Sequence, residues 1–324
     1  MLRKNILIVG AGRLAVRHCE GLQKSSHKIN LFVFDVSKFQ LSTLENKINY
    51  REASSKISTL KCFTNLKTLN DQLSNFDMII VSSTAKNRDY LLKNLFNNFK
   101  SKYWLVEKPL TQSVKGLKRI MRAHKNENVW VNHFRRIVPW QEEIKNLMID
   151  KGPLTIDVQS PSLGIACNIS HYIDLTMYWT GEIPIQVNTK ALDKKWIPSK
   201  RPLFFEIEGT IKINFSGGTK LKIISSDKVK QYLISVSSPE EKKDFIINEE
   251  NEMATSWNDK NIPGKMLLQS EMTGWLFDEL ESKQSCSLPT LEEAIKGYAP
   301  IIEALELHWN KCSNEPYQDI VPIT

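Results

Sequence analysis

The chain has 324 residues and a formal net charge of +8, from 44 Lys and Arg residues against 36 Asp and Glu residues. Because this length exceeds that of a usual single domain, we expect two domains, each with its own core. No run approaches the roughly 20 apolar residues of a membrane span, and the basic residues are not interleaved with aromatic ones, so we expect neither membrane nor nucleic-acid binding. The positive charge favours anionic ligands, although an evenly Lys-rich composition explains it as well.

Five cysteines are scattered along the chain without a CxxC pair: Cys19, Cys62, Cys167, Cys286 and Cys312. An odd number at irregular spacing predicts reduced thiols in a cytoplasmic protein, rather than a disulfide framework or a zinc site, and we expect no metal. Residues 6–9 form an apolar run that stops at Gly10 with no cleavage pattern. We therefore interpret this run as a first strand and not as a signal peptide.

Short apolar runs alternate with longer amphipathic stretches between residues 5 and 132. The predicted strands are 5–9, 29–34, 61–64, 78–82, 103–106 and 129–132, and the predicted helices are 13–24, 38–50, 66–73, 87–99 and 113–126. This alternation is typical of a doubly wound parallel sheet, the Rossmann type of α/β fold, and predicts a first domain over residues 1–132. Such sheets bind ligands beyond the carboxyl ends of their strands.

A glycine turn follows the first predicted strand and fits the G-x-G-x-x-G/A pattern: Gly10-Ala-Gly12-Arg13-Leu14-Ala15. Gly10 permits the tight turn, Gly12 lets the main chain approach a pyrophosphate, and Ala15 keeps the following helix close to the strand. The helix that begins here directs its free amides and positive dipole end towards phosphates. We therefore expect Gly10, Gly12, Arg13 and Leu14 to bind a dinucleotide.

Asp35 ends the second predicted strand, about 20 residues after the glycine turn, where an acidic side chain can bind a ribose diol. Its charge would repel a 2′-phosphate, which favours NAD, although Lys38 can bind such a phosphate and leaves NADP open. After the fourth predicted strand, Ser83 and Thr84 can line the nicotinamide ribose or cap the next helix. His18 lies on the first helix beside apolar residues, and we interpret it as structural.

The fifth predicted strand ends in Glu107-Lys108-Pro109. A lysine at a buried strand end loses solvation, so its ammonium is easier to deprotonate or to share in a hydrogen bond. Pro109 fixes the local main chain and removes a donor, and Glu107 can hold the lysine electrostatically. Lys108 is therefore a candidate for proton handling, although lysines at strand ends are often only solvated.

These motifs together resemble the Gfo/Idh/MocA family of NAD(P)-dependent sugar and cyclitol oxidoreductases. The resemblance rests on the glycine turn, on Glu107-Lys108-Pro109 and on a later histidine segment. It implies that Lys108 contacts the nicotinamide and the reacting hydroxyl, that Glu107 lies at the cofactor, and that the Lys-Pro bond is often cis. The family commonly has Thr-Pro-x-x-x-His after the fourth strand, where this chain reads Thr84-Ala-Lys-Asn-Arg-Asp89. This departure weakens any cofactor role for Asp89.

The chain leaves the predicted first domain at residue 133, shortly before Arg135 and Arg136. In the family an arginine near this point often faces the substrate, and the planar fork of either side chain could hold an anionic or polyhydroxyl ligand. Surface arginines at a domain junction are an equal alternative. A helix over residues 139–150 follows and is stopped by Gly152-Pro153.

A further helix is predicted over residues 167–181, with Gly181 at its end. His171, Asp174 and Tyr178 share one face of this helix, so we expect His171 and Asp174 to point together into one pocket. An imidazole titrates near neutral pH, which makes His171 a candidate acid/base. Asp174 would orient the substrate or the histidine, and Tyr178 would contact the substrate. A core histidine without a catalytic role is the alternative.

The family pattern in this helix is Asp-x-x-x-His-x-x-Asp, commonly with Gly just before the His. This chain keeps His171 and Asp174 but has Cys167 in place of the first Asp and Ser170 in place of the Gly. In the family the missing carboxylate often completes a Lys-Asp-His set that moves the hydroxyl proton. Asn168 can hydrogen-bond but cannot take a proton, and a buried inert thiol is the expected state of Cys167.

Longer alternating strands are predicted beyond residue 184: 185–192, 203–215, 219–225, 231–236 and 243–248. They indicate an open, mostly antiparallel sheet with helices on one face, in a second, α+β domain over residues 133–324. Helices over 265–282 and 291–311 follow and can pack back on the first domain, with Thr290 capping the last one. In the family another subunit often covers such a sheet, so we expect a homodimer or homotetramer.

We therefore expect an NAD(P)-dependent oxidoreductase that transfers a hydride between nicotinamide and a hydroxyl or ketone carbon of a sugar, sugar nucleotide or related acid. Lys108 would polarise the oxygen and His171 would exchange its proton. The departure at Cys167 leaves open a non-catalytic dinucleotide- or sugar-binding protein of the same fold. A second alternative is an enzyme that breaks a C–O bond and recycles its bound cofactor.

Overall fold

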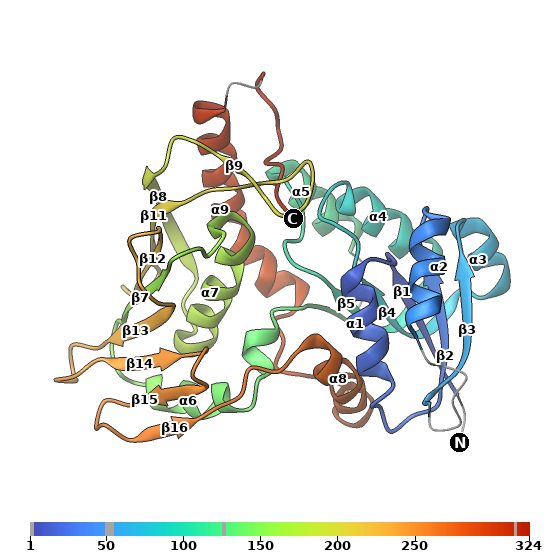
Figure 1. The fold of residues 1–324 in the computed structure, drawn as a ribbon, viewed down its shortest axis with the longest axis horizontal. Helices are drawn as coiled ribbons and strands as arrows, with labels where there is room; N and C mark the ends of the chain where they lie inside the picture. Colours follow the sequence, from blue (N-terminus) through green and yellow to red (C-terminus); the bar gives the residue numbers. More distant parts are fainter. Residues whose placement is uncertain (1–2, 49–54, 125–127, 314–315) are drawn as a thin grey trace. The chain divides into compact units, whose positions relative to one another are not determined.

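The structure is a computed structural model that describes residues 3–48, 55–124, 128–313 and 316–324. Its chain contacts divide it into two units (Figure 1). The first unit comprises Met1–Leu110, Lys118–Asn132 and Leu267–Leu291, and the second comprises Thr111–Leu117, His133–Met266 and Glu292–Thr324. Among the described residues, no helix combines the length and the apolar character needed to cross a membrane.

The first unit is built on a six-stranded parallel sheet with the strand order β3-β2-β1-β4-β5-β6. Its strands are β1 (Lys4–Val9), β2 (Ile29–Phe34), β3 (Ile57–Phe63), β4 (Asn75–Val81), β5 (Lys100–Val106) and β6 (Val129–Val131). The connecting helices are α1 (Arg13–Leu22), α2 (Lys38–Lys47), α3 (Leu66–Gln72), α4 (Arg88–Asn98) and α5 (Val114–Ala123). Because the strand order reverses at β1 and crossovers are right-handed, α1 and α2 lie on the face opposite to α4 (Figure 1). The predicted doubly wound sheet is confirmed.

The strands β3, β4 and β5 begin three or four residues before their predicted starts. Their first residues are mostly polar, and they pair through the main chain although they add little apolar surface. Residues 49–50 of the predicted helix 38–50 and residues 125–126 of the predicted helix 113–126 lie outside the described residues. The apolar pattern therefore located the buried ends of β4 and β5, whereas it missed the start of β3, where Ile57 is buried.

Helix α8 (Gln269–Lys283) packs directly on α1 within the first unit. A Cβ atom added to Gly274 would lie 2.4 Å from the carbonyl oxygen of Gly21, and one added to Gly21 would lie 2.8 Å from Cβ of Thr273. Only glycine allows the two main chains to approach so closely. The glycine pair therefore fixes where α8 crosses α1.

The second unit contains an eight-stranded sheet with the order β16-β15-β14-β13-β7-β12-β11-β8. Its strands are β7 (Thr155–Ser160), β8 (Pro184–Leu192), β11 (Gly209–Phe215), β12 (Lys220–Ser225), β13 (Leu233–Ser237), β14 (Phe245–Asn248), β15 (Met253–Thr255) and β16 (Asn261–Pro263). Only β7 and β12 pair in parallel among these described strands. The predicted open, mostly antiparallel sheet is confirmed.

Several elements of the second unit differ from the sequence prediction. The predicted strand 203–215 is broken, because Gly209 has φ of 106° and closely approaches Ala191. Its first part, β10 (Phe205–Glu206), pairs instead with β9 (Ile197–Pro198). The strands β7, β15 and β16 were not predicted, because each offers only one or two inward-facing apolar side chains. The helix predicted over 265–282 begins at Gln269.

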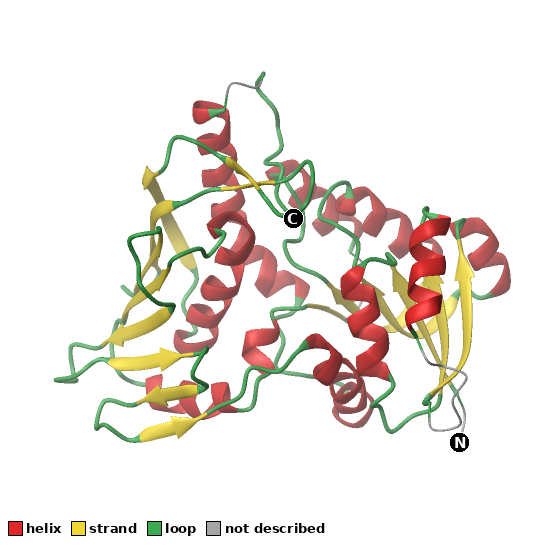
Figure 2. Ribbon diagram, viewed as in Figure 1, coloured by secondary structure: helices red, strands yellow, loops and turns green. Residues whose placement is uncertain are grey.

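The helices of the second unit are η1 (Phe134–Ile137), α6 (Trp140–Met148), α7 (Ile165–Thr180) and α9 (Leu291–Cys312). Helix α7 packs on one face of the sheet, against β12 (Figure 2). It ends as predicted at Gly181, which has φ of 71° and donates its N–H to the carbonyl oxygen of Met177 at 2.8 Å. The alternation of buried and exposed residues along β12 leaves the other face of the sheet partly exposed.

Candidate functional site

The glycine turn joins β1 to α1 at the carboxyl edge of the parallel sheet. Gly10 has φ of 97°, and a Cβ atom there would lie 2.8 Å from the main-chain nitrogen of Ser83. Gly12 differs, because a Cβ atom on it would have no protein atom within 4 Å. Packing therefore requires the first glycine, whereas the space beside the second is open at the start of α1. Because Gly12 has no side chain, a phosphate group can approach the main chain closely at this position.

Helix α1 starts at Arg13, and its N-cap residue Gly12 provides no side-chain hydrogen bond to the first turn. The free amides of this turn are the donors that a pyrophosphate would bind. Arg13 is exposed and Leu14 is partly buried. Both residues therefore border the open space beside the glycine turn.

Asp35 lies directly after β2 and binds the glycine turn through its carboxylate. The Oδ2 atom accepts the N–H of Ala11 at 2.8 Å, and Oδ1 accepts the N–H of Ser37 at 2.8 Å. Each oxygen has a second lone pair for a ribose hydroxyl, and the side chain is partly exposed. Lys38 begins α2 and is exposed. Asp35 thus has both a structural contact and the chemistry expected of a ribose ligand.

Ser83 and Thr84 follow β4 at the same edge of the sheet. Helix α4 begins after Asn87, which makes no side-chain capping bond, so neither hydroxyl residue is the N-cap of this helix. The Ser83 hydroxyl oxygen is buried and has no hydrogen-bond partner among the described residues, whereas Thr84 is exposed. The capping alternative for these two residues is wrong.

Lys108 lies directly after β5, and the Lys108–Pro109 peptide bond is cis. The buried guanidinium of Arg88 donates hydrogen bonds to the carbonyl oxygens of Glu107 and Pro109, on both sides of the lysine, and to that of Ser83. Lys108 itself is partly exposed. Sequence reasoning missed Arg88, whose only signal was its place just after the fourth strand.

Glu107 is buried beneath the end of β5. Its Oε1 atom accepts hydrogen bonds from His18 Nε2, at 3.1 Å, and from the amide of Asn132. Burial alone would raise the pKa of Glu107, but these hydrogen bonds and the nearby Arg88 outweigh it and lower the pKa. Glu107 is therefore a buried carboxylate that is ionised at neutral pH. Asp89, by contrast, forms an ion pair with Arg119.

His171 lies in the middle of α7, and only 1% of its surface is exposed. Its ring meets those of His133 and Phe134 edge to face, with centroid distances of 5.4 Å and 5.1 Å. His171 is thus enclosed by rings from the segment that precedes and begins η1. His133 was not singled out from the sequence.

The two candidate arginines are both paired with carboxylates. Arg136 Nε donates to Asp174 Oδ2 at 2.9 Å. Burial raises the pKa of Asp174 to about 7, against the opposing effect of Arg136. Arg135 instead makes a two-pronged contact with Glu249, with N–O distances of 3.0 Å and 3.1 Å. The alternative of simple surface arginines is wrong, because neither side chain is solvated freely.

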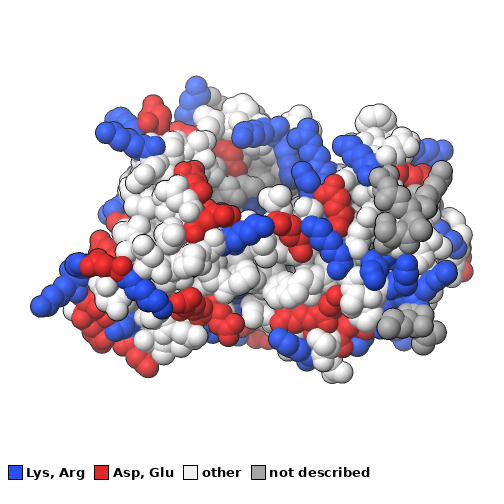
Figure 3. All heavy atoms as spheres, turned by 60° about the horizontal axis from the view of Figure 1, so that its bottom comes forward, with Lys and Arg blue, Asp and Glu red and all other residues white. Residues whose placement is uncertain are grey.

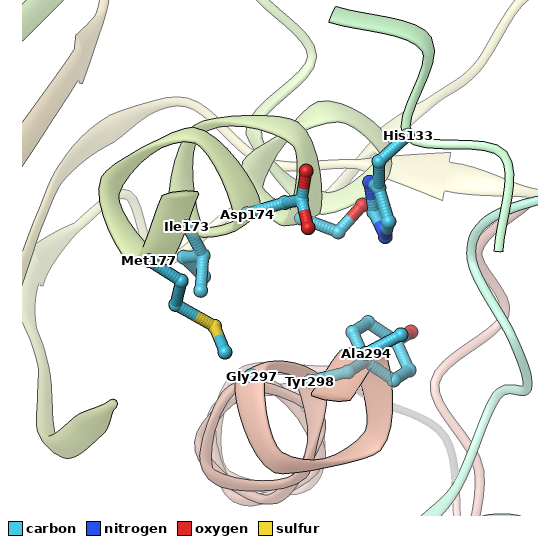
Figure 4. A pocket seen from close by; sticks show the side chains of 8 residues that line it. His133, Ile173, Asp174, Met177, Ala294, Gly297 and Tyr298 are labelled. Atoms are coloured by element: carbon cyan, nitrogen blue, oxygen red, sulfur yellow. The ribbon is translucent and has the colours of Figure 1, made fainter. Parts of the chain in front are cut away.

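A small cavity of about 10 Å³ lies between α7 and α9 in the second unit. Its lining residues are His133, Ser170, Ile173, Asp174, Met177, Ala294, Gly297 and Tyr298. Figure 4 shows the Asp174 carboxylate and the His133 ring on the α7 side, facing the Tyr298 ring on α9. The Ser170 hydroxyl is buried here and has no hydrogen-bond partner among the described residues. At this size, the cavity offers its polar groups to about one water molecule.

A second, wider depression of about 490 Å³ lies around the end of α7 and contains Tyr178. Lys145 Nζ lies 4.3 Å and the Arg136 guanidinium 5.2 Å from the centre of the Tyr178 ring. Glu293 and Lys296 also line it. Tyr178 and Asp174 therefore line different cavities, although the helical spacing places them on one face of α7.

Cys167 occupies the first turn of α7. Its thiol donates to the main-chain oxygen of Thr324 at 2.6 Å, and its N–H donates to the Glu206 carboxylate at 3.3 Å. Glu206 is thus the carboxylate beside the position where the resembled family has Asp. Its place on the short strand β10 gave no signal in the sequence.

Charge and metal-ligand patterns add no further site. Figure 3 shows basic and acidic side chains interspersed over the face in view. Within the described ranges, no group of three or more His, Cys, Asp or Glu residues could hold a metal ion.

Known structures share this fold at low sequence identity. An oxidoreductase from Agrobacterium radiobacter, in complex with NAD+, L-tartaric acid and magnesium, is 13% identical with a TM-score of 0.71, over 94% of this chain and 95% of that chain. A scyllo-inositol dehydrogenase from Lactobacillus casei, with bound NAD(H) and scyllo-inositol, is 15% identical with a TM-score of 0.67, over 96% and 98%. Biliverdin reductase from Synechocystis sp. PCC 6803, with biliverdin and NADP+, is 13% identical with a TM-score of 0.69, over 95% and 98%.

Sequence comparison gives one family match, in the first part of the chain. The search of curated proteins finds no match for the chain. The model of an oxidoreductase family with an NAD-binding Rossmann fold, GFO_IDH_MocA, matches residues 4–133. These residues contain the glycine turn, Asp35 and the Glu107-Lys108-Pro109 segment. Residues 4–133 are therefore similar to the NAD-binding domain of the Gfo/Idh/MocA family of oxidoreductases.

Proposed function

We propose that this protein is an NAD(P)-dependent dehydrogenase or reductase that acts on a hydroxyl or ketone carbon of a sugar, sugar nucleotide or sugar acid. The observation that carries the proposal is the shared edge of the parallel sheet in the first unit. The glycine turn follows β1, Asp35 follows β2, and Lys108 follows β5. Because the carboxyl ends of parallel strands meet at one edge, a bound nucleotide and the amine of Lys108 would lie at the same edge of the sheet.

The residues of this edge fit a dinucleotide. The open space at Gly12, with Arg13 and Leu14 beside it, suits the pyrophosphate, and the remaining lone pairs of Asp35 suit a ribose diol without a 2′-phosphate. NAD is therefore the proposed cofactor, with NADP as the second choice. Ser83 and Thr84 are proposed to line the nicotinamide ribose, and Glu107 to support the site from beneath. When bound, the nicotinamide supplies the hydride-transfer chemistry.

The protein supplies position and proton handling. Lys108 is proposed to polarise the reacting oxygen, and its main chain is held by Arg88 on both sides. His171 is proposed to exchange the hydroxyl proton. Arg136 and Asp174 are proposed to orient the substrate as a pair, which is supported by their 2.9 Å contact.

The sugar-type substrate is supported by relatives of the same fold that bind scyllo-inositol or L-tartaric acid. An anionic substrate is supported by the cations around Tyr178, which are Arg136, Lys145 and Lys296. Arg135 is proposed to act on the substrate only indirectly, through its pairing with Glu249. Biliverdin reductase has the same fold, so activity assays are needed to identify the substrate class.

Two further properties are proposed. The partly exposed face of the eight-stranded sheet is proposed to be covered by a second copy of the chain, in a homodimer or homotetramer. The five cysteines are all free thiols, which supports a reducing compartment such as the cytoplasm.

The experiment follows NADH and NADPH absorbance at 340 nm, the ordinary wavelength of reduced nicotinamide, with a panel of cyclitols, sugar acids and sugar nucleotides. Lys108→Ala should lower kcat by about 100-fold or more while cofactor affinity changes little. Lys86→Ala removes an exposed lysine near the same edge and is the matched control. Tight cofactor binding without turnover of any substrate would favour the non-catalytic binding protein, for which Cys167 is the best support. Cofactor that survives purification would favour the enzyme that recycles it.

A further inference from the structure

Five side chains of the first unit form a closed ring of hydrogen bonds beneath the end of β5. His18 Nε2 lies 3.1 Å from Glu107 Oε1, and His18 Nδ1 lies 3.0 Å from Thr273 Oγ1. Asn132 donates to Glu107 Oε1 and, at 2.8 Å, to Gln269 Oε1. Gln269 Nε2 closes the ring by donating to Thr273 Oγ1 at 2.9 Å. We call this set the Glu107 ring.

The proton positions in the Glu107 ring follow from its acceptors. An ionised Glu107 can only accept, so Nε2 of His18 carries the proton between them. The Thr273 hydroxyl already accepts from Gln269, and its proton can go to His18 Nδ1 or to the main-chain oxygen of Gln269, both 3.0 Å away. His18 therefore has a fixed orientation, with one nitrogen assigned to the carboxylate and the other to α8.

The ring is buried, so its bonds are not replaced easily by water. His18 and Thr273 are 0% exposed, Asn132 is 2% and Glu107 is 4% exposed, and only Gln269 is partly open. When the His18 donor is lost, the Glu107 carboxylate keeps only the amide of Asn132 as a side-chain donor. Because a buried charge that loses a hydrogen bond is destabilised, Glu107 should change its position when His18 is altered.

Glu107 directly precedes Lys108, so its position affects the lysine. The main chain on both sides of Lys108 is held by Arg88. The Glu107 side chain adds a second anchor, to the nucleotide-binding helix α1 through His18 and to α8 through Asn132 and Gln269. We propose that His18 is a positioning residue for Lys108, acting through the Glu107 carboxylate. The functional consequence rests on the proposed dehydrogenase activity.

Two substitutions separate this role from general packing. His18→Gln retains an N–H near the place of Nε2 and can still bind Glu107, whereas His18→Asn retains one only near the place of Nδ1 and can bind only Thr273. Both variants are neutral amides at a buried position. If His18 were only structural, the two variants should have similar effects on Lys108.

The first measurement is the initial rate at which N-hydroxysuccinimidyl acetate acetylates Lys108 in the full chain, by peptide mass spectrometry. Exposed Lys93 is the internal reference. His18→Asn should change the rate at least about threefold, as loss of one hydrogen bond to a charged group can, and His18→Gln should stay close to the wild type. This readout needs no substrate, so it decides the positioning role even if no turnover is found.

Where turnover is found, His18→Asn should lower kcat about tenfold or more with KM and cofactor affinity little changed, and His18→Gln should restore most of it. Tyr103→Phe is the matched control, because it removes a different buried bond from β5 to α8, at 2.7 Å, without touching Glu107. If His18→Asn does not fold, Gln269→Met opens the ring at its most exposed member and should shift the Lys108 rate. Equal Lys108 rates in His18→Asn, His18→Gln and the wild type, or an equal effect of Tyr103→Phe, would overturn the proposal.

Discussion

The Arg136 guanidinium donates to the Asp174 carboxylate over 2.9 Å, in a part of the second unit where both side chains are more than nine-tenths buried. The pair joins two residues that the sequence had suggested as separate substrate ligands. Because the two side chains contact each other, a change at Arg136 leaves the carboxyl group of Asp174 buried without its partner. A change at Asp174 leaves the guanidinium of Arg136 buried without its partner. The pair therefore couples the proposed substrate binding to stability.

Asp174 should make stability depend on pH in a characteristic direction. Burial raises the pKa of Asp174 in the folded protein to about 7, above the usual range of an aspartate. As pH rises from about 4 to about 7, the unfolded chain loses this proton first, so the contribution of Asp174 to stability falls. Asp174→Asn should remove this component, which amounts to at most about 4 kcal/mol. Urea unfolding should therefore give a free energy of unfolding for the wild type, minus that for the variant, that is larger near pH 4 than near pH 8. If the free energies of the two proteins change with pH in parallel, the pKa assigned to Asp174 is wrong.

The two glycines of the turn should respond differently to alanine. Gly10→Ala should lower stability by about 1–3 kcal/mol, because φ is positive and the methyl group would meet Ser83. Gly12→Ala should leave the melting temperature nearly unchanged but weaken NAD binding about tenfold or more, because its methyl group would enter the phosphate space. Thermal melting and fluorescence titration with NADH measure the two effects. Unchanged NADH affinity in Gly12→Ala would place the cofactor elsewhere.

Asp35 should set the choice between the two nicotinamide cofactors. Asp35→Asn removes the charge that repels a 2′-phosphate but keeps one acceptor for the N–H of Ala11 or Ser37. The ratio of NADP to NAD affinity should rise about tenfold, the scale of one hydrogen bond to a charged group. Asp71→Asn is an exposed control with the same change of charge. A ratio that stays constant in titrations at fixed salt would remove Asp35 from the ribose site.

Arg88 should be important for stability as well as for activity. Arg88→Met keeps much of the volume but leaves three main-chain carbonyl groups without their donor, which should cost about 3 kcal/mol or more. Asp89→Asn alters the adjacent residue and only disrupts its pair with the partly exposed Arg119, so the loss should be smaller. Urea unfolding of both variants provides the comparison. Equal losses would mean that the carbonyl contacts of Arg88 contribute little.

The local parts of the fold could be predicted because they depend on neighbouring residues. The glycine turn, Asp35 after β2 and the end of α7 at Gly181 follow from backbone conformation and strand alternation. The Glu107 ring could not be predicted, since its five residues come from four separate segments. The same holds for Arg135, whose partner Glu249 lies 114 residues away. Spacing on α7 placed Asp174 and Tyr178 on one face, but the two side chains line different cavities.

The crossing of α8 over α1 has a consequence for biosynthesis. Thr273 and His18 are 255 residues apart, yet their helices touch main chain to main chain. A ribosome must therefore release the chain through α8 before the nucleotide-binding half can bury the side of its first helix that faces α8. Until then that surface is open to chaperones and proteases, and a nascent chain arrested before residue 269 would display it permanently.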